Sequence, residues 1–175
     1  MKRMVIIISA LVVILLSIPI FADEPLCKIE AIANEENYKN YMSDIEKVKD
    51  IFGEFGQQYI FTDENLNEKF NFGFETNVLG TSTGKKIYID TNHYDENVVL
   101  HETIHAYDFS KDYISDDACF EEIYKNNKEK ISVTGGNNQN VYEFFASSGE
   151  NFFKNPDDLK TRAPEVYDFF RTEFN

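Results

Sequence analysis

Two histidines four residues apart are the side chains of this sequence best placed to do chemistry. His101 and His105 begin and end the segment H-E-T-I-H, and Glu102 stands beside the first of them. On a helix, residues at this spacing project from one face about a turn apart, as two ligands of one zinc ion require. The carboxylate of Glu102 would then lie near the open coordination position of the metal. The segment therefore predicts a zinc centre, with one ion per chain and Glu102 as the catalytic base.

The small number of histidines supports this interpretation. The chain contains three, and two of them occupy the motif. His93 lies in the turn-like segment T-N-H-Y and is typical of a solvated loop residue, so we leave it out of the site. The alternative is that His101 and His105 are ordinary helix residues that bind no metal.

A third metal ligand must come from elsewhere in the chain, because a catalytic zinc takes three protein ligands and leaves a position for water. The residues after His105 lack the glycine and the histidine of the longer H-E-x-x-H-x-x-G-x-x-H motif, so we expect a carboxylate from a later helix. The candidates are Glu121, Glu122, Glu129, Glu143 and Glu150. Glu143 is preferred because it opens a strongly aromatic helix after a polar break, and Glu150 on the same face comes second. The alternative for Glu143 is a charge stabilised by the helix dipole.

Hydrophobic periodicity predicts a mainly helical second half of the chain. The predicted helices cover residues 38–55, about fifteen residues after Asp95 that include the histidine pair, residues 116–130, a segment from Val141 and a segment after Pro164. Gly53 and Gly56 are expected to end the first helix. The polar, glycine-containing segment 134–140 should separate the third helix from the fourth.

Short strands are predicted between the first two helices. They are Y-I-F at 59–61, N-F-G-F at 71–74 and K-I-Y-I-D at 86–90. The segment 79–84 contains two glycines, which is typical of a loop or an irregular edge strand. A small mixed sheet followed by helices is an α+β arrangement, and we predict this fold class.

The N-terminal residues have the composition of a secretory signal peptide. Lys2 and Arg3 precede an apolar run, and Ala22 offers a cleavage point. An uncleaved transmembrane anchor is the alternative, because the run has nearly the length that a bilayer requires. Pro19 and the lack of a following basic cluster favour cleavage. We therefore expect a signal peptide at 1–22, a polar and acidic segment typical of a flexible leader at 23–36, and one domain at 37–175 of a secreted, extracellular protein.

Charge and cysteine content restrict the partners and the covalent structure. Removal of Lys2 and Arg3 would change the net charge from −14 to −16. Such a surface repels nucleic acid and anionic membranes, so we exclude nucleic-acid binding and expect no membrane association after signal cleavage. We expect a monomer.

Export permits a disulfide between Cys27 and Cys119, and the alternative is a free Cys27 in a mobile N-terminus with a buried Cys119.

Three ordered segments resemble a family of zinc peptidases. These segments are H-E-T-I-H-A-Y-D at 101–108, Y-E-F-F-A at 142–146 and A-P-E-V-Y-D-F-F at 163–170. The family is related to the catalytic domain of anthrax lethal factor and to the secreted clostridial Pro-Pro endopeptidases, which are closer in organisation. The resemblance covers the chain from about Lys86 onward. It implies a zincin-like fold, zinc ligands His101, His105 and Glu143, and Glu102 as the base.

Two positions depart from the family pattern. Ser147 stands one turn after Glu143, where the family usually has a second acidic residue. The segment 135–140 lacks the tyrosine that is thought to stabilise the oxyanion, and Tyr142 does not match its position. The departures favour a degenerate zincin that binds a protein or peptide without cutting it, whereas the retained Glu102 favours an enzyme.

The activity that the resemblance implies is that of a secreted zinc metalloendopeptidase acting on extracellular proteins. Cleavage between two prolines is the implied specificity, so the partner would be a protein or peptide substrate rich in proline. In zincins the substrate lies extended along an edge strand, which we expect just before residues 86–90. A toxin-like protease that acts on host proteins is the alternative among enzymes. An acidic secreted domain with an accidental motif is a further alternative.

Overall fold

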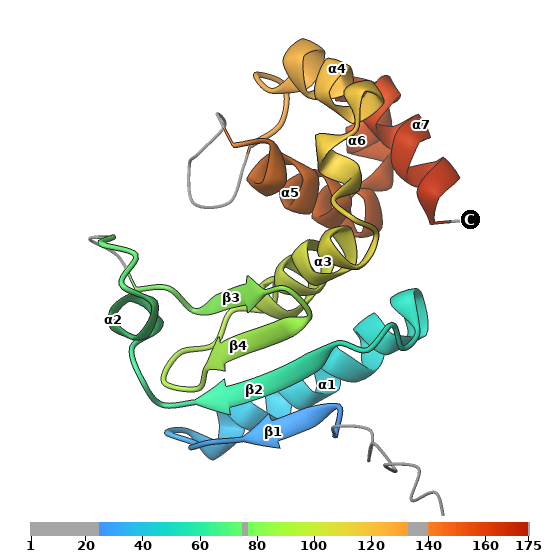
Figure 1. The fold of residues 1–175 in the computed structure, drawn as a ribbon. Coiled ribbons are helices and arrows are strands. Elements are labelled where there is room, and N and C mark those ends of the chain that lie inside the picture. Colours follow the sequence, from blue (N-terminus) through green and yellow to red (C-terminus); the bar gives the residue numbers. More distant parts are fainter. Residues whose placement is uncertain (1–24, 75–76, 133–139, 175) are drawn as a thin grey trace, which may run out of the picture.

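A four-stranded sheet and a group of helices form the two halves of the computed structural model, which describes residues 25–74, 77–132 and 140–174 (Figure 1). The strands are β1 (Cys27–Ile29), β2 (Gln58–Thr62), β3 (Gly80–Thr83) and β4 (Lys86–Asp90). The helices are α1 (Glu35–Phe52), α2 (Leu66–Phe70), α3 (Val98–Ser110), a 3₁₀ turn (Ile114–Asp116), α4 (Ala118–Asn127), α5 (Val141–Lys154), α6 (Pro156–Arg162) and α7 (Pro164–Glu173). The predicted α+β class is confirmed.

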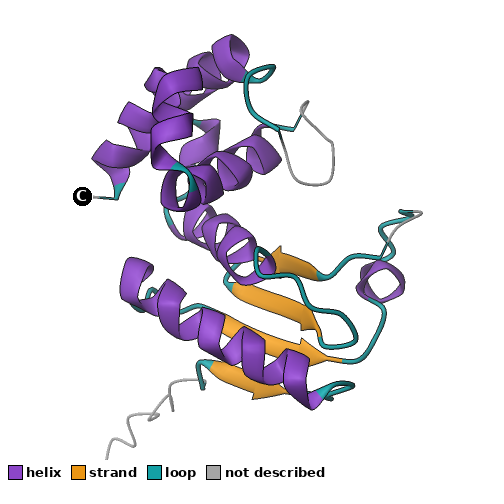
Figure 2. Ribbon diagram, turned by 180° about the vertical axis from the view of Figure 1, so that it is seen from behind, coloured by secondary structure: helices purple, strands orange, loops and turns teal. Residues whose placement is uncertain are grey.

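The sheet is mixed and ends in an antiparallel edge strand. Its order is β1-β2-β4-β3, in which β1 and β4 run parallel to β2 and β3 runs antiparallel to β4. Every residue of β2 is buried, as expected for a central strand covered on both faces. Helix α1 lies along one face of the sheet (Figure 2). Among the described residues, strand β3 has a strand partner on one side only, and residues of β3 line the cleft described below.

Residues 71–74 do not form the strand that their sequence predicts. Asn65 caps α2 by accepting hydrogen bonds from the backbone N–H groups of Asn67 and Glu68, and Asn71 ends that helix in the left-handed conformation. The aromatic residues then pack on one another instead of pairing in the sheet: the Phe70, Phe72 and Phe74 rings stack in succession. Local capping therefore overrides the strand propensity here.

The leader predicted at 23–36 is corrected for the part that the structure describes, residues 25–36. Strand β1 pairs with β2, and the backbone N–H of Tyr59 donates to the carbonyl of Leu26 at 2.7 Å. Asn34 then caps α1, so this helix begins at Glu35. The sequence does not indicate β1, because this edge strand has only three residues and lies in a polar segment. The proposed signal peptide lies outside the described residues.

The two cysteines are free, so the disulfide considered from the sequence is not formed. Cys27 lies half-buried in β1, and Cys119 is exposed on α4, which also contradicts the expectation of a buried Cys119. The segment after α5 contains one helix more than predicted, α6, which begins at Pro156. Most of the polar segment 134–140 lies outside the described residues.

Helix α3 occupies the centre of the molecule, between the sheet and the C-terminal helices (Figure 1). On the sheet side, the hydroxyls of Thr103 and Tyr59 form a buried hydrogen bond of 2.9 Å. On the other side, Ile104 packs against α5 at Gly149, where an added Cβ would lie only 3.1 Å from Ile104 Cδ1. Helix α3 is thereby fixed on two sides.

None of the described helices has the length and apolar character needed to cross a membrane.

Phe120 is expected to be a major stabilising residue of the helical half. Its ring is fully buried between the Phe145 and Phe169 rings, at centroid distances of 5.0 and 4.8 Å. Replacing a buried phenylalanine with alanine leaves a cavity and costs about 3–5 kcal/mol. We therefore expect Phe120→Ala to lower the free energy of unfolding by this amount in urea denaturation. Phe74→Ala is the control, because Phe74 is 60 % exposed and should change stability by only about 0.5 kcal/mol. Equal losses in the two variants would contradict this account of the core.

Candidate metal centre

The ligand atoms of His101, His105 and Glu143 converge on one point. The Nε2 atoms of the two histidines are 3.2 Å apart. The Glu143 carboxylate lies 3.2 Å from Nε2 of His101 and 3.5 Å from Nε2 of His105. These three residues are the group of potential metal ligands found among the described residues. The structure thus brings together the three side chains that the sequence predicts as ligands.

The spacing of the three ligand atoms fits a tetrahedral zinc site. With metal–ligand bonds of about 2.0–2.2 Å, two ligands of a tetrahedral ion lie about 3.3–3.6 Å apart. The Nε2 atoms of the two histidines are 3.2 Å apart, and each lies 3.2–3.5 Å from one of the two Glu143 oxygens, which is close to this range. Two imidazoles and one carboxylate are also a donor set that zinc accepts, and three ligands leave the fourth position for water. The residues therefore fit the metal that the sequence predicts.

Two helices position the three ligands. His101 and His105 lie one turn apart on α3, and their rings are in edge-to-face contact. Glu143 lies in the first turn of α5, which Asn140 caps by accepting a hydrogen bond from the backbone N–H of Tyr142. The start of α5 therefore sets the position of Glu143, and the close packing of α5 on α3 brings it to the histidines.

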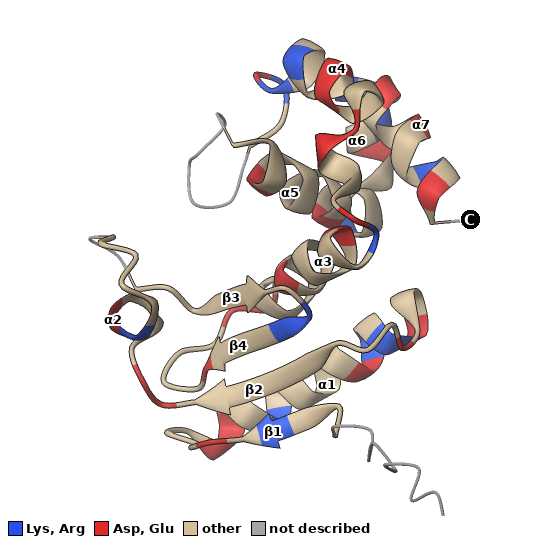
Figure 3. Cartoon of the chain, viewed as in Figure 1, with Lys and Arg blue, Asp and Glu red and all other residues tan. Residues whose placement is uncertain are grey.

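The electrostatics of the metal-free site favour a cation at the position where the ligands meet. Burial lowers the pKa of His101, but a hydrogen bond to Glu143 and the nearby carboxylate of Glu150 outweigh it and raise the pKa to about 10. Burial raises the pKa of Glu143, but hydrogen bonding to His101 and His105 holds it well below its usual range. A proton on His101 thus compensates the Glu143 carboxylate in the absence of metal. Acidic residues occur on both ligand helices, whereas their one basic residue, Lys154, lies at the far end of α5 (Figure 3).

Glu102 lies in the same cleft, against the edge strand. Burial raises the pKa of its carboxyl group, while attraction to His105 and His101 acts in the opposite direction. Strand β3 approaches this side chain closely at Gly80: an added Cβ would lie 2.9 Å from Glu102 Cγ and 2.6 Å from Val98 Cγ1. Glycine is therefore required here by close packing between β3 and α3. The sequence left open whether Gly80 simply formed a flexible loop, and the structure places it in a strand.

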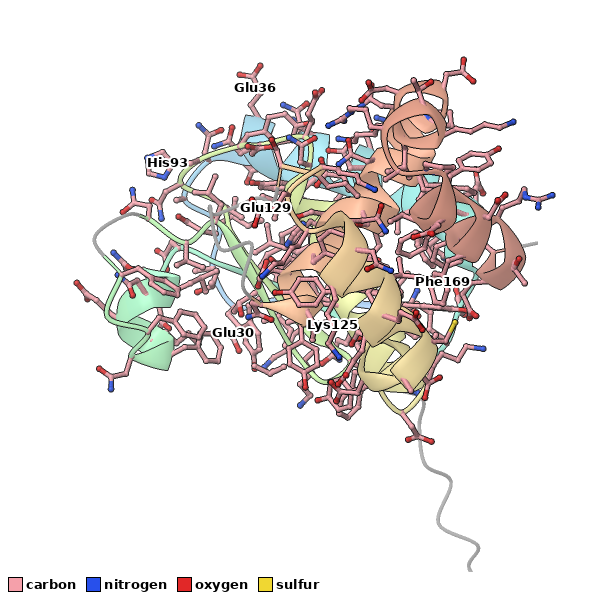
Figure 4. All side chains as sticks on the ribbon, turned by 90° about the horizontal axis from the view of Figure 1, so that it is seen from above. Glu30, Glu36, His93, Lys125, Glu129 and Phe169 are labelled. Carbon is pink, nitrogen blue, oxygen red and sulfur yellow. The ribbon has the colours of Figure 1, made fainter. Side chains whose placement is uncertain are left out.

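The other sequence candidates do not join the three ligands. Glu121, Glu122 and Glu129 are exposed on or beyond α4. His93 also lies apart, at the periphery of the molecule, with 58 % of its side chain exposed (Figure 4). Glu150, the second choice for the third ligand, lies near the opposite ring nitrogen of His101, Nδ1, at 3.5 Å. Its carboxylate is therefore behind the ligand and not beside the metal position.

A cleft of about 830 Å³ contains the ligands and Glu102. Residues of β3 line it, together with aromatic side chains from two separate parts of the chain. Phe72 and Phe74 belong to the stacked aromatic segment after α2. The other group consists of Phe109, Tyr113 and Tyr142, whose rings pack edge to face in that order. The cleft thus combines titratable polar groups with apolar walls, as ligand sites usually do.

Tyr113 is a cleft residue that the sequence analysis missed. It has a left-handed backbone, with φ of 60°, which is uncommon for a bulky residue. The carboxylate of Asp108 holds the following turn by accepting hydrogen bonds from the backbone N–H of Ser115 at 2.9 Å and from its hydroxyl at 2.5 Å. The carbonyl of Asp108 accepts a further bond from the backbone N–H of Tyr113. No periodic pattern marks such a turn, so only the structure identifies Tyr113.

Comparison with known proteins supports the fold. No family model matches the sequence, and no curated protein matches it. The structure is similar to that of the Pro-Pro endopeptidase PPEP-2 from Paenibacillus alvei, with a TM-score of 0.62 and 18 % sequence identity. The match covers 85 % of this chain and 97 % of that chain. It confirms the zincin-like fold, and at this identity it shows the fold alone. The resemblance to the lethal factor catalytic domain stays a prediction.

Zinc binding is expected to release a proton from the site. His101 is protonated in the metal-free protein at pH 7, because its pKa is raised to about 10. A zinc ligand must be a neutral imidazole, so binding displaces this proton. We expect release of about one proton per zinc ion at pH 7, and an affinity that rises about tenfold per pH unit from pH 6 to 8. Isothermal titration calorimetry in buffers of different protonation enthalpy measures the proton count. Observed binding enthalpies that are the same in all buffers would show that no proton is released, and this would contradict the description of His101.

Proposed function

We propose that this protein is a zinc-dependent endopeptidase that acts on extracellular proteins, with bonds between prolines as its preferred substrates. The observation that carries the proposal is the convergence of the His101, His105 and Glu143 ligand atoms beside Glu102 in one cleft. The similarity of the fold to a Pro-Pro endopeptidase supports it. The signal-like composition of residues 1–22 supports the extracellular location.

Glu102 is the proton carrier of the proposed reaction. A zinc ion bound at the three ligands would lower the pKa of its water and polarise the scissile carbonyl. Glu102 accepts the proton of the attacking water and delivers it to the leaving amine. The raised pKa of its carboxyl group supports this role, because a general base works best when its pKa approaches the working pH.

The proposed substrate lies extended beside β3. This strand pairs with β4 on one side and lines the cleft on the other, so a peptide backbone can add to the sheet there. The aromatic residues Phe72 and Phe74 at one wall and Tyr113 and Tyr142 at the other suit apolar side chains on the substrate. Proline rings pack well on aromatic surfaces, which is consistent with the proposed specificity.

Glu102→Gln tests the proposal directly. The variant keeps the shape of the side chain but cannot accept the proton, so we expect cleavage to fall by about 10²–10⁴-fold while zinc stays bound at one ion per chain. The assay is cleavage of a proline-rich peptide library by the purified protein, with zinc content measured on each sample. Glu121→Gln is the control, because Glu121 is an exposed carboxylate paired with Lys125.

The outcomes of this assay distinguish the functions considered from the sequence. Cleavage by the wild type that is lost in Glu102→Gln supports the peptidase. Zinc at one per chain without cleavage by the wild type would favour a degenerate binding protein. The absence of zinc would refute the metal centre altogether. Cleavage at bonds without proline would keep the enzyme and reject the specificity.

We further assign Tyr113 as the second donor to the developing oxyanion, because it is the cleft phenol with a free hydroxyl. The hydroxyl of Tyr142 donates to Asp116 at 2.9 Å. The Tyr113 hydroxyl has no hydrogen-bond partner within the described part of the chain. Tyr113→Phe is therefore expected to lower kcat by about 10²–10³-fold with little change in KM. Tyr142→Phe is the matched control and should retain most of the activity. The reverse result for the two variants would reject the assignment.

A further inference from the structure

Nδ1 of His101 and Oε2 of Glu150 form a buried polar pair that the proposed reaction does not use. The two atoms are 3.5 Å apart. Each is enclosed in the protein and lacks a completed hydrogen bond, and within the described residues only the hydroxyl of Ser148 shares this condition among side-chain atoms. Buried polar atoms without partners are rare and costly. N–H···O hydrogen bonds reach about 3.2 Å between the heavy atoms. A small side-chain movement would therefore let Nδ1 of His101 donate to Oε2 of Glu150.

The two nitrogens of the His101 ring face different carboxylates. Nε2 lies 3.2 Å from Glu143, on the cleft side, whereas Nδ1 faces Glu150. Glu150 follows Glu143 by seven residues, which is two turns, so both project from one face of α5. Of the two side chains, Glu150 is the more enclosed, with 15 % exposed against 33 % for Glu143. The ring of His101 is thus held between two carboxylates of one helix.

The packing of the helices explains why Glu150 reaches α3. Its neighbour Gly149 packs closely, because an added Cβ would lie 3.1 Å from Ile104 of α3 and 3.3 Å from Phe170 of α7. A carboxylate next to this contact starts close to the surface of α3. Ser147, one turn after Glu143, is also buried on α5 but carries no carboxylate. The geometry therefore provides one acidic side chain behind His101.

We propose that Glu150 is a positioning residue for the metal centre: it accepts the Nδ1–H of His101 and thereby directs the lone pair of Nε2 toward the metal. This inference rests on the metal centre of the proposed function. A histidine ligand that donates its second N–H to a carboxylate is fixed in one tautomer and one orientation, and it becomes a stronger ligand.

Zinc affinity tests the inference independently of peptidase activity. Removal of such a partner weakens metal binding by roughly 10–100-fold. We expect this loss in Glu150→Gln and Glu150→Ala, measured by competition with a chromophoric zinc chelator, and partial recovery in Glu150→Asp. Asp157→Asn is the matched control for charge, because Asp157 is an exposed carboxylate on the neighbouring α6. It should bind zinc as the wild type does.

A spectroscopic measurement separates positioning from a general structural effect. In the zinc-loaded protein with ¹⁵N-labelled histidine, we expect a downfield Nδ1–H resonance of His101 that moves upfield in Glu150→Gln. The spectrum of the cobalt-substituted protein should stay tetrahedral in both, because Glu150 is not a ligand. Glutamine has nearly the same shape as glutamate, so both measurements can still be made on Glu150→Gln if Glu150→Ala does not fold.

Three results would overturn the inference. Unchanged zinc affinity together with an unmoved Nδ1–H resonance in Glu150→Gln would show that Glu150 does not act on His101. A changed coordination number in the cobalt spectrum would make Glu150 a ligand instead. If the wild type binds no zinc, the proposed function fails as well. In the first two cases the peptidase proposal stands, because wild-type zinc content and cleavage are measured separately.

Discussion

The close approach of α5 to α3 is the constraint on which the candidate metal centre depends. At Gly149 of α5, an added Cβ would lie only 3.1 Å from Ile104 of α3, and 3.3 Å from Phe170 of α7. This contact places the N-terminal turn of α5 against the histidine face of α3, with Glu143 among the ligand atoms and Glu150 behind His101. The ligand geometry therefore depends on the packing of α5 on α3.

The sheet fixes α3 from the other side and completes the cleft. The buried Thr103–Tyr59 hydrogen bond joins α3 to β2, and Gly80 allows β3 to lie against Glu102. Because α3 is held between the sheet and α5, only its polar face is left for the cleft. The same edge strand that positions the proposed base also presents its free side to a substrate. Rigid support of this kind is what a precise catalytic geometry requires.

Charge distribution at the centre follows from burial. Histidine and glutamate side chains this enclosed are costly unless each compensates another. In the metal-free protein the compensation is a proton on His101 beside the Glu143 carboxylate, and a divalent cation would replace it. The site is thus electrostatically prepared for metal, and Glu102 stands apart with a raised pKa. Apart from the charged groups, the helical half is held by aromatic packing: the Phe120 ring contacts Phe145 of α5 and Phe170 of α7.

The sequence by itself determined which helix and which strand form around the candidate site, and which residues share a helix face. The i, i+4 spacing put His101 and His105 on one face of a helix, and the alternation at 86–90 specified β4, because both patterns arise from the periodicity of a single element. Glu143 was preferred on composition and on resemblance, yet its contact with the histidines and the position of Glu150 behind the ring were decided by tertiary packing. The short strand β1 was also beyond local patterns, because it depends on pairing with the distant strand β2. At 71–74 and at Tyr113 the local caps and turn contacts outweigh propensity, and hydrophobic periodicity does not report them.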